Sequence, residues 1–312
     1  MSFYENLSEF KGLRVVDWTD KSDKIDPAKN AVRLRVEYDE VDDGVSIGDK
    51  IVGLLAIPAA AKIQSLIIGS WSPDDSGVNS SDMVEHLVSA REKLPQLRNL
   101  FLGDIIGEEC EISWIQQSDL SPLLAAYPRL EHLTVRGGEG LTFGTLSHAH
   151  LKELVVQTGG LPPSVVHEVA AAKLPALEHL ELYLGEPNYG GEATVEDLAP
   201  LLRAGLFPKM KYLGIKDSVI QDEIAGVLAI APVLDQLQTL DLSLGTLGDE
   251  GAKALLASPK IRKLKRLDLH HHFISDALCR KLGALGIDVD LSDKQEPHEF
   301  RGQEDRFIAV SE

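Results

Sequence analysis

Leucines recur at one short spacing through most of the chain. Near its C-terminal end, Leu237, Leu240 and Leu242 stand at the spacing Leu-x-x-Leu-x-Leu, and residues 264–269 repeat it. Between the two frames, the apolar residues of segment 247–256 fall at helical spacing. Each unit is therefore predicted to be a short strand followed by an amphipathic helix. Because such a unit cannot bury its own apolar face, neighbouring units are predicted to stack into a solenoid.

The middle leucine of the frame marks eight predicted strands. They are centred on Leu66, Leu100, Leu133, Leu154, Leu180, Leu213, Leu240 and Leu267. A strand is also predicted at residues 32–36, where apolar and charged residues alternate, and a last strand begins at Ile287. Helices are predicted within residues 51–57, 81–88, 195–205, 222–231 and 275–282. The short interval between Leu133 and Leu154 leaves room only for a turn or a 3₁₀ segment.

These frames, together with the segment GTLGDEGAKALLAS, resemble the leucine-rich repeat of ribonuclease-inhibitor type over roughly residues 63–291. The segments GDIIGEECEISWIQQSD, TGGLPPSVV and LELYLGEPNYGG also resemble an uncharacterised bacterial family of cytoplasmic leucine-rich-repeat proteins. The resemblance implies an α/β solenoid with a curved parallel sheet on its concave side and helices and irregular segments on its convex side. It implies no established activity.

The chain departs from that repeat at the turn after six of the strands. The repeat carries Asn or Cys there, whereas this chain has Gly138, Gly159, Gly185, Gly245, Ser218 and His272. Glycine permits a tight turn but supplies no side chain to bond the backbone. We expect an N-terminal cap at residues 1–30, the solenoid at residues 31–291 and a C-terminal tail at residues 292–312. The segment RFIAV either folds back over the open end of the array or is disordered.

Charge narrows the range of partners. The 312 residues include 31 Lys and Arg against 49 Asp and Glu, a formal net charge of -18. This excess of negative charge repels nucleic acid and anionic lipid, so a charged partner is expected to be basic. The chain shows no basic, apolar leader and no apolar run that could span a bilayer, which predicts a cytoplasmic protein.

The outward-facing strand positions are the first candidate site. Residues between the frame leucines point away from the helices, and they mix aromatic with charged side chains, a composition typical of protein-binding surfaces. The predicted partner-binding residues on this face are Phe101, His132, Arg136, Glu181, Tyr183, Tyr212, Asp241 and Asp268. The alternative is a strand face that only meets solvent.

The long loops after three strands are the second candidate site. Segments 69–81, 103–119 and 185–197 exceed the usual repeat length and lie on the same edge of a solenoid. We expect them to form an acidic, aromatic rim that receives a basic segment. Its predicted binding residues are Trp71, Asp74, Asp75, Asp104, Glu108, Glu109, Trp114 and Tyr189. Alternatively, Trp71, Trp114 and Ile115 plug the solenoid and the carboxylates are solvated.

Residues that could support catalysis or bind a metal ion are the alternative to a protein-binding surface. Cys110 lies between Glu109 and Glu111, whose charges suppress the thiolate, and it forms no metal or disulfide spacing with Cys279. His270, His271 and His272 cannot converge on one ion, because consecutive strand residues face opposite sides. The prediction is a non-enzymatic protein–protein interaction module without a metal or cofactor. The alternatives are an accessory enzyme or metal-dependent protein with its site around residues 104–114, and a self-associating subunit. The partner, the process and the oligomeric state stay open.

Overall fold

The frame leucines form the buried ladder of a sheet. The computed structural model describes residues 3–19, 25–300 and 303–311. Leu66 pairs with Leu100 and Leu100 with Leu133, while Leu180, Leu213, Leu240 and Leu267 pair in the same way further along. All of these leucines are fully buried. The register predicted from the spacing is therefore the register that the strands adopt.

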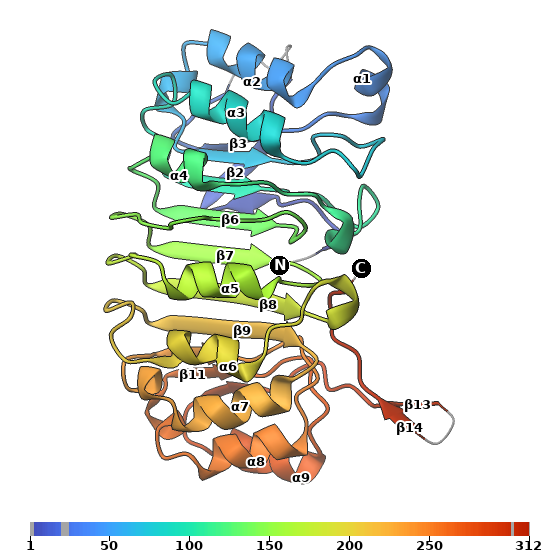
Figure 1. The fold of residues 1–312 in the computed structure, drawn as a ribbon, viewed down its shortest axis with the longest axis vertical. Coiled ribbons are helices and arrows are strands. Elements are labelled where there is room, and N and C mark those ends of the chain that lie inside the picture. Colours follow the sequence, from blue (N-terminus) through green and yellow to red (C-terminus); the bar gives the residue numbers. More distant parts are fainter. Residues whose placement is uncertain (1–2, 20–24, 301–302, 312) are drawn as a thin grey trace. The chain divides into compact units, whose positions relative to one another are not determined.

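Twelve strands are hydrogen-bonded in sequence order (Figure 1). Strands β1 and β2 are antiparallel, and the pairings from β2 to β6 and from β8 to β12 are parallel. Their bounds are β1 Glu9–Phe10, β2 Leu13–Asp17, β3 Asn30–Leu34, β4 Ser65–Ile68, β5 Asn99–Leu102, β6 His132–Arg136, β7 Glu153–Gln157, β8 His179–Gly185, β9 Tyr212–Ser218, β10 Thr239–Asp241, β11 Arg266–Asp268 and β12 Asp288–Asp290. The fold is an α/β leucine-rich-repeat solenoid, as predicted.

Helices occupy the intervals between strands. The α-helices are α1 Tyr38–Asp42, α2 Ile47–Ala56, α3 Ser81–Ser89, α4 Ser121–Ala126, α5 Pro163–Ala170, α6 Val195–Leu198, α7 Gln221–Ile230, α8 Asp249–Ala257 and α9 Asp276–Gly283. The 3₁₀ helices are η1 Ala60–Lys62, η2 Ile112–Trp114, η3 Pro187–Tyr189, η4 Ala199–Leu202, η5 Pro232–Asp235 and η6 Ile261–Lys263. Residues 137–152, all of them described, form turns and bridges, as the short interval predicts.

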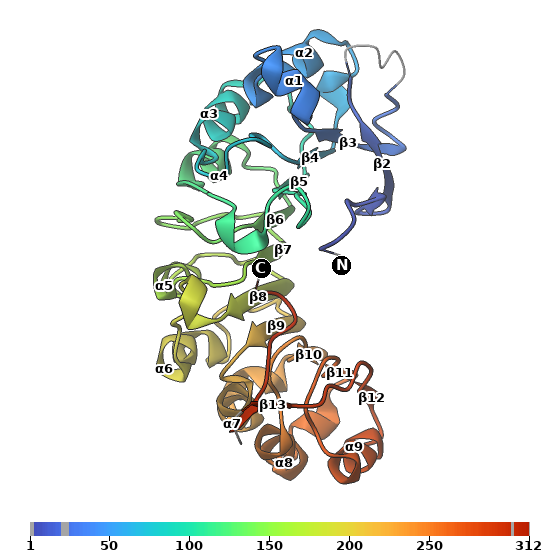
Figure 2. The same ribbon diagram turned by 90° about the vertical axis from the view of Figure 1, so that its right-hand side faces the viewer.

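The chain separates into two compact units, residues 1–156 (unit 1) and residues 157–311 (unit 2). In unit 1, helices α2, α3 and α4 cover one face of strands β3 to β6, and the N-terminal segment lies on the other face (Figure 2). Ser46 and Asp49 form a capping box that starts α2, which ends before Pro58. The helices bury their apolar faces on the strands, as the sequence pattern requires.

Unit 2 carries helices α5 to α9 and a separate hairpin, β13 His298–Phe300 with β14 Gln303–Asp305. After the hairpin the chain folds back on the end of β9 and on the turns that follow β10 and β11. Val310 donates its backbone N–H to Asp217 Oδ1 at 3.0 Å, and Ala309 donates to the Leu244 carbonyl oxygen at 2.8 Å. Ile308 and Val310 are buried. The apolar end of the tail thus packs against strand ends within unit 2.

Two of the unusual turn residues show how this chain closes its turns. A Cβ at Gly185 would lie 1.8 Å from the Gly159 carbonyl oxygen, so only glycine fits there. His272 is fully buried, and its Nδ1 accepts from the Ile274 N–H while its Nε2 bonds the Leu291 carbonyl oxygen. The imidazole therefore bonds backbone in the place of the usual Asn.

The described residues contain no helix of the length and apolar character that crossing a bilayer requires.

Candidate functional site

The loops after β4 and β5 meet at one edge of unit 1, next to α1. Trp71 is buried, and its Nε1 donates to the Val78 carbonyl oxygen at 2.9 Å, so this ring holds the 69–81 loop in shape. Trp114, on η2, is 54% exposed. The two tryptophans therefore differ in role, since one packs inside the loop and the other faces solvent.

A pocket of about 280 Å³ opens between these loops. We call it the rim pocket. It is lined by Tyr38, Ser72, Pro73, Asp74, Ser76, Glu109, Cys110, Glu111 and Trp114. The structure thus brings together three of the predicted rim residues, Asp74, Glu109 and Trp114. It adds Tyr38, which was missed because the long loops were counted only from the strand at Leu66 onward, although Val32 and Leu66 are paired across an equally long interval.

The charges of the rim pocket are mostly negative. Arg35 Nη1 donates to Glu109 Oε1 at 3.3 Å, and the Ile106 N–H donates to Glu109 Oε2 at 3.0 Å. Burial raises the pKa of the Cys110 thiol, and Glu111 and Glu109 raise it further. The thiol is therefore protonated at neutral pH and is a poor nucleophile.

The other predicted rim residues are not part of the lining of this pocket. Asp75 is exposed and accepts from the Gly77 N–H at 2.8 Å, and Glu108 is exposed. Asp104 is buried, with 1% of the residue exposed. Tyr189, in η3 of unit 2, is partly exposed.

Asp104 is one of three predicted residues that contact the chain's own N-terminal segment. Its carboxylate accepts from Arg33 Nη1 at 2.8 Å and from the Leu7 N–H at 3.3 Å. Phe101 packs against Phe10, with ring centroids 6.2 Å apart. Contrary to the expectation that these side chains face a partner, residues 3–17 cover them.

Arg136 is the third of these residues. Its guanidinium lies 4.8 Å from the Phe3 ring centroid and donates to the Ile105 carbonyl oxygen at 2.6 Å. His132 lies at the edge of this cover, where its Nδ1 bonds Asn99 Oδ1 at 2.6 Å. Burial lowers the pKa of His132, and the Lys11 charge lowers it further. At neutral pH the imidazole is uncharged.

Unit 2 presents a different strand face. We call Glu181, Tyr183, Tyr212, Lys216 and Asp241 the strand-face network. Lys216 Nζ lies 3.0 Å from Asp241 Oδ2, 3.4 Å from Glu181 Oε1 and 5.0 Å from the Tyr183 ring centroid. The Tyr212 hydroxyl donates to Asp241. All five side chains belong to outward strand positions in the sequence pattern, and their charged and polar groups pair with one another.

The protonation states of the network follow from burial and pairing. Burial by itself raises the pKa of Glu181, but the hydrogen bond to His179 and the charge of Lys216 outweigh it and lower that pKa to about 2. Burial raises the pKa of Tyr212, and the Asp241 charge raises it further. Lys216 and Glu181 are therefore an ion pair, and both tyrosines are neutral.

The edge of this face is more open. His179 stacks on Tyr212 with ring centroids 3.8 Å apart, and both rings are partly exposed. Arg266 donates to Asp268, Asp288 and Asp290, each at 2.8 Å. Three carboxylates around one guanidinium leave this edge with net negative charge.

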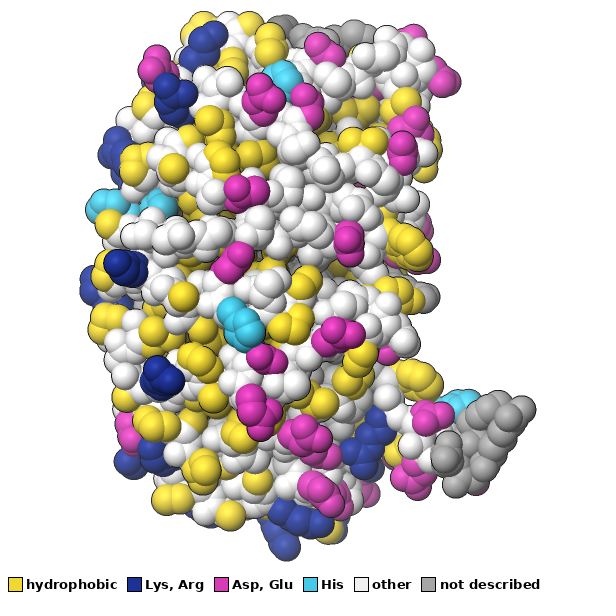
Figure 3. Space-filling model, viewed as in Figure 1, with side chains coloured by type: hydrophobic (Ala, Val, Ile, Leu, Met, Phe, Trp, Pro, Cys, Tyr) yellow, Lys and Arg dark blue, Asp and Glu magenta, His cyan; other side chains and the backbone are white. Residues whose placement is uncertain are grey.

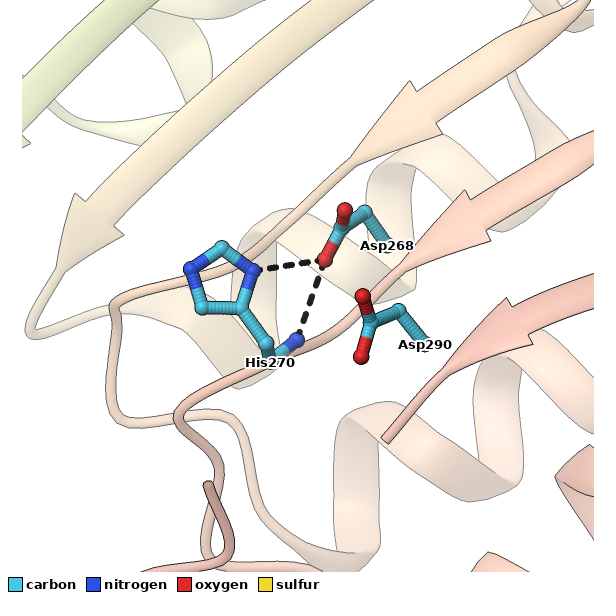
Figure 4. Close-up of side chains that lie close together, drawn as sticks. All are labelled: Asp268, His270 and Asp290. Atoms are coloured by element: carbon cyan, nitrogen blue, oxygen red, sulfur yellow. Dashed lines mark hydrogen bonds and ion pairs between the residues drawn. The ribbon is translucent and has the colours of Figure 1, made fainter. Parts of the chain in front are cut away.

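Asp268, His270 and Asp290 place one ligand atom each within 4.8 Å of one another (Figure 4). His270 Nδ1 hydrogen-bonds Asp268 Oδ1 at 2.7 Å, while Arg266 takes an oxygen of each carboxylate. The hydrogen bond to Asp268 raises the pKa of His270, against the effect of burial. A metal ion at this cluster would have to displace the His270 proton and compete with Arg266.

Among the solved structures that are similar to the chain, one matches most of its length. It is a Bacteroides fragilis protein determined by a structural genomics consortium, 35% identical, with a TM-score of 0.81. The match covers 89% of this chain and 76% of that one. The chain belongs to the family of this Bacteroides fragilis protein. This family membership accounts for the shared fold and assigns no activity.

Other comparisons add little. An internalin from Listeria monocytogenes is 17% identical, with 84% of this chain and 78% of that one covered and a TM-score of 0.32. No protein-family model matches the chain, and no curated protein matches it.

Proposed function

We propose that the chain is a non-enzymatic protein–protein interaction module that binds a basic segment of a partner. The proposed binding residues are the predicted residues that are exposed or partly exposed, on the strand face of unit 2 and on the rim of unit 1. Phe101, Asp104 and Arg136 instead contact the N-terminal segment, and Tyr183 and Asp241 are buried within the strand-face network.

The open edge of the unit 2 strand face is the observation that supports this proposal most directly. The side chain of Asp288 is 62% exposed and that of Arg266 is 40% exposed. The partly exposed rings of Tyr212 and His179 lie along the same edge, two and three strands away from Arg266. Partly exposed aromatic rings beside charged groups are the composition that anchors protein partners. The surplus of carboxylates, with a net charge of -18 for the chain, favours a basic partner.

We also propose the type of the repeats, the source of the protein and the compartment in which it works. The repeats are of ribonuclease-inhibitor type, because GTLGDEGAKALLAS forms a strand-to-helix unit with α8 between β10 and β11. The protein is bacterial, as the Bacteroides fragilis relative is. It works in the cytoplasm, where two free cysteines stay reduced.

Site-specific photocrosslinking in the native host tests the proposal. A benzophenone amino acid is placed at Asp288, on the exposed strand face, and in a second variant at Lys253, exposed on α8. We expect the first variant to crosslink one protein through a peptide rich in Lys or Arg, and the second to leave that protein uncrosslinked. Equal crosslinking at both positions, or none at position 288, would contradict the proposal.

A metal-dependent accessory protein is the second candidate function. Among the described residues, the Asp268, His270 and Asp290 cluster favours it, rather than residues 104–114 where the sequence places that alternative. Titration of the protein with Zn²⁺ in a calorimeter separates the two functions. A stoichiometric heat that His270→Ala abolishes would support this candidate, and no heat is expected from an interaction module alone.

A further inference from the structure

We propose that the rim pocket binds an arginine side chain carried by an extended segment of the partner protein. This inference rests on the proposed protein-binding function and names the chemistry of one contact. It is carried by the pocket of about 280 Å³ between α1 and the loops after β4 and β5, by its two aromatic rings and by its three carboxylates.

The aromatic rings of the rim pocket are unusually exposed. Tyr38 is 61% exposed and Trp114 is 54% exposed, whereas Trp18 and Trp71 are buried at 5% and 8%. Val78, which is 42% exposed, lies in the 69–81 loop, which also holds Trp71. Large apolar side chains gathered around one loop mark an interaction site. The faces of Trp and Tyr rings attract a guanidinium, which also stacks on them because it is planar.

The carboxylates supply the second half of the recognition. Asp74, Glu109 and Glu111 line the pocket, and the lining contains no Lys or Arg. Arg35 contacts Glu109 from outside the lining. Within the described part of the chain, neither Asp74 nor Glu111 forms an ion pair. Figure 3 shows the same imbalance on the right-hand side of unit 1, where magenta and yellow side chains are visible and the dark-blue ones lie on the left.

The pocket continues into an apolar groove. A neighbouring cavity of about 290 Å³ shares Ser72 and Asp74 with the rim pocket and is lined further by Val36, Val41, Trp71 and Met83, among others. An arginine in the rim pocket would place the adjacent residue of its segment against this groove. The occupant is therefore an arginine next to an apolar residue in an extended peptide.

A divalent cation is a poorer match for the same carboxylates. Among the described residues, the group of metal-ligating side chains that converges within 4.8 Å is Asp268, His270 and Asp290, in unit 2. Asp74, Glu109 and Glu111 do not converge in this way, and aromatic walls offer a metal ion no ligand. A wide pocket with stacking surfaces suits a planar, delocalised cation.

The fluorescence that Trp114 contributes, taken as the difference between the protein and its Trp114→Phe variant, reports the binding, because Trp18 and Trp71 emit equally in both. The probe is a short peptide with two Arg-Leu pairs, compared with a second peptide in which citrulline, the neutral isostere, replaces each arginine. We expect saturable quenching of Trp114 by the arginine peptide and binding at least about tenfold weaker for the citrulline peptide. Equal binding of the two peptides would overturn the proposal.

Matched variants separate this pocket from general charge attraction. Calorimetry compares Asp74→Asn with Glu111→Gln, as a double variant, against Glu85→Gln with Glu250→Gln, which removes the same charge from exposed sites on α3 and α8. We expect the first pair to weaken the arginine peptide about tenfold and the second to change its affinity less than about twofold. Trp114→Ala should weaken binding, and Trp114→Phe should largely retain it.

The arginine site and the protein-binding function are tested by separate measurements, so each can fail without the other. If both double variants weaken the peptide equally, the rim pocket is not the site and this inference falls. Photocrosslinking from position 288, in unit 2, is a separate measurement of partner binding. If position 288 crosslinks a partner while the rim pocket binds no arginine peptide, the chain is still a protein-binding module, but one without an arginine site.

Discussion

The strand faces of the two units are built from equivalent positions of the repeat and are protected in opposite ways. In unit 1 the outward side chains include Ile67 and Phe101, which Phe10 and the N-terminal segment cover. In unit 2 the outward side chains of the strand-face network pair with one another around Lys216. An apolar face needs a separate segment of chain to shield it from water, whereas a charged face can satisfy itself. The charged strand face of unit 2 therefore keeps its edge accessible to a partner.

The largest effect is expected from breaking the strand-face network. Lys216→Met leaves Glu181 and Asp241 buried without their cation, and we expect it to lower the free energy of unfolding by about 3–5 kcal/mol. The control is Lys211→Met, which removes the exposed ion pair with Glu178 and should cost at most about 1 kcal/mol. Urea unfolding of both variants measures the difference. Similar losses would mean that the network adds nothing beyond surface pairing.

The cover of unit 1 is tested by Phe10→Ala. Removing this buried ring from its packing on Phe101 should cost about 3 kcal/mol and loosen residues 3–17. The exposed neighbour Glu9→Ala is the control and should change little. Limited proteolysis should cut the Phe10→Ala variant earlier within this segment. Unchanged proteolysis would show that the N-terminal segment is held by contacts other than the ring.

The stability of the folded chain in acid is expected to depend on the carboxylate of Glu181. Because folding lowers its pKa from 4.5 to about 2, the ionised carboxylate stabilises the folded state above pH 4.5, and that stabilisation is lost as the pH falls toward 2. Glu181→Gln should lower stability at pH 7 by about 2 kcal/mol and flatten the decline between pH 4.5 and 2. Thermal unfolding across this range measures it. An unchanged slope would assign the acid sensitivity to other carboxylates.

The smallest effect is expected at the rim. Trp114→Ala should change the free energy of unfolding by no more than about 0.5 kcal/mol, because this side chain is 54% exposed. Its removal should shift the tryptophan emission to shorter wavelength, since Trp18 and Trp71 are buried. A loss of several kcal/mol would show that Trp114 plugs the solenoid instead of facing a ligand.

The repeat architecture could be predicted from the spacing of leucines alone. Leu66, Leu100 and Leu133 pair in the predicted register because the pattern of a parallel strand is local and a shift by one residue would turn its apolar side outward. The apolar periodicity of residues 247–256 predicts a helix in the same way, and α8 lies there. Helices α2 and α7 lie where an apolar stretch and an interval between strands predict them. Local patterns such as these need no knowledge of distant residues.

The surroundings of the outward side chains were decided only by the tertiary structure. Phe101 occupies an outward strand position, and nothing near it in the chain reveals that Phe10 covers it. Asp74 and Trp114 belong to different loops, and Tyr38 reaches their pocket from α1. Such contacts join residues far apart in sequence, so their formation depends on how the whole chain packs. The leucine pattern determines where the sheet is, and long-range packing determines which parts of its surface stay open.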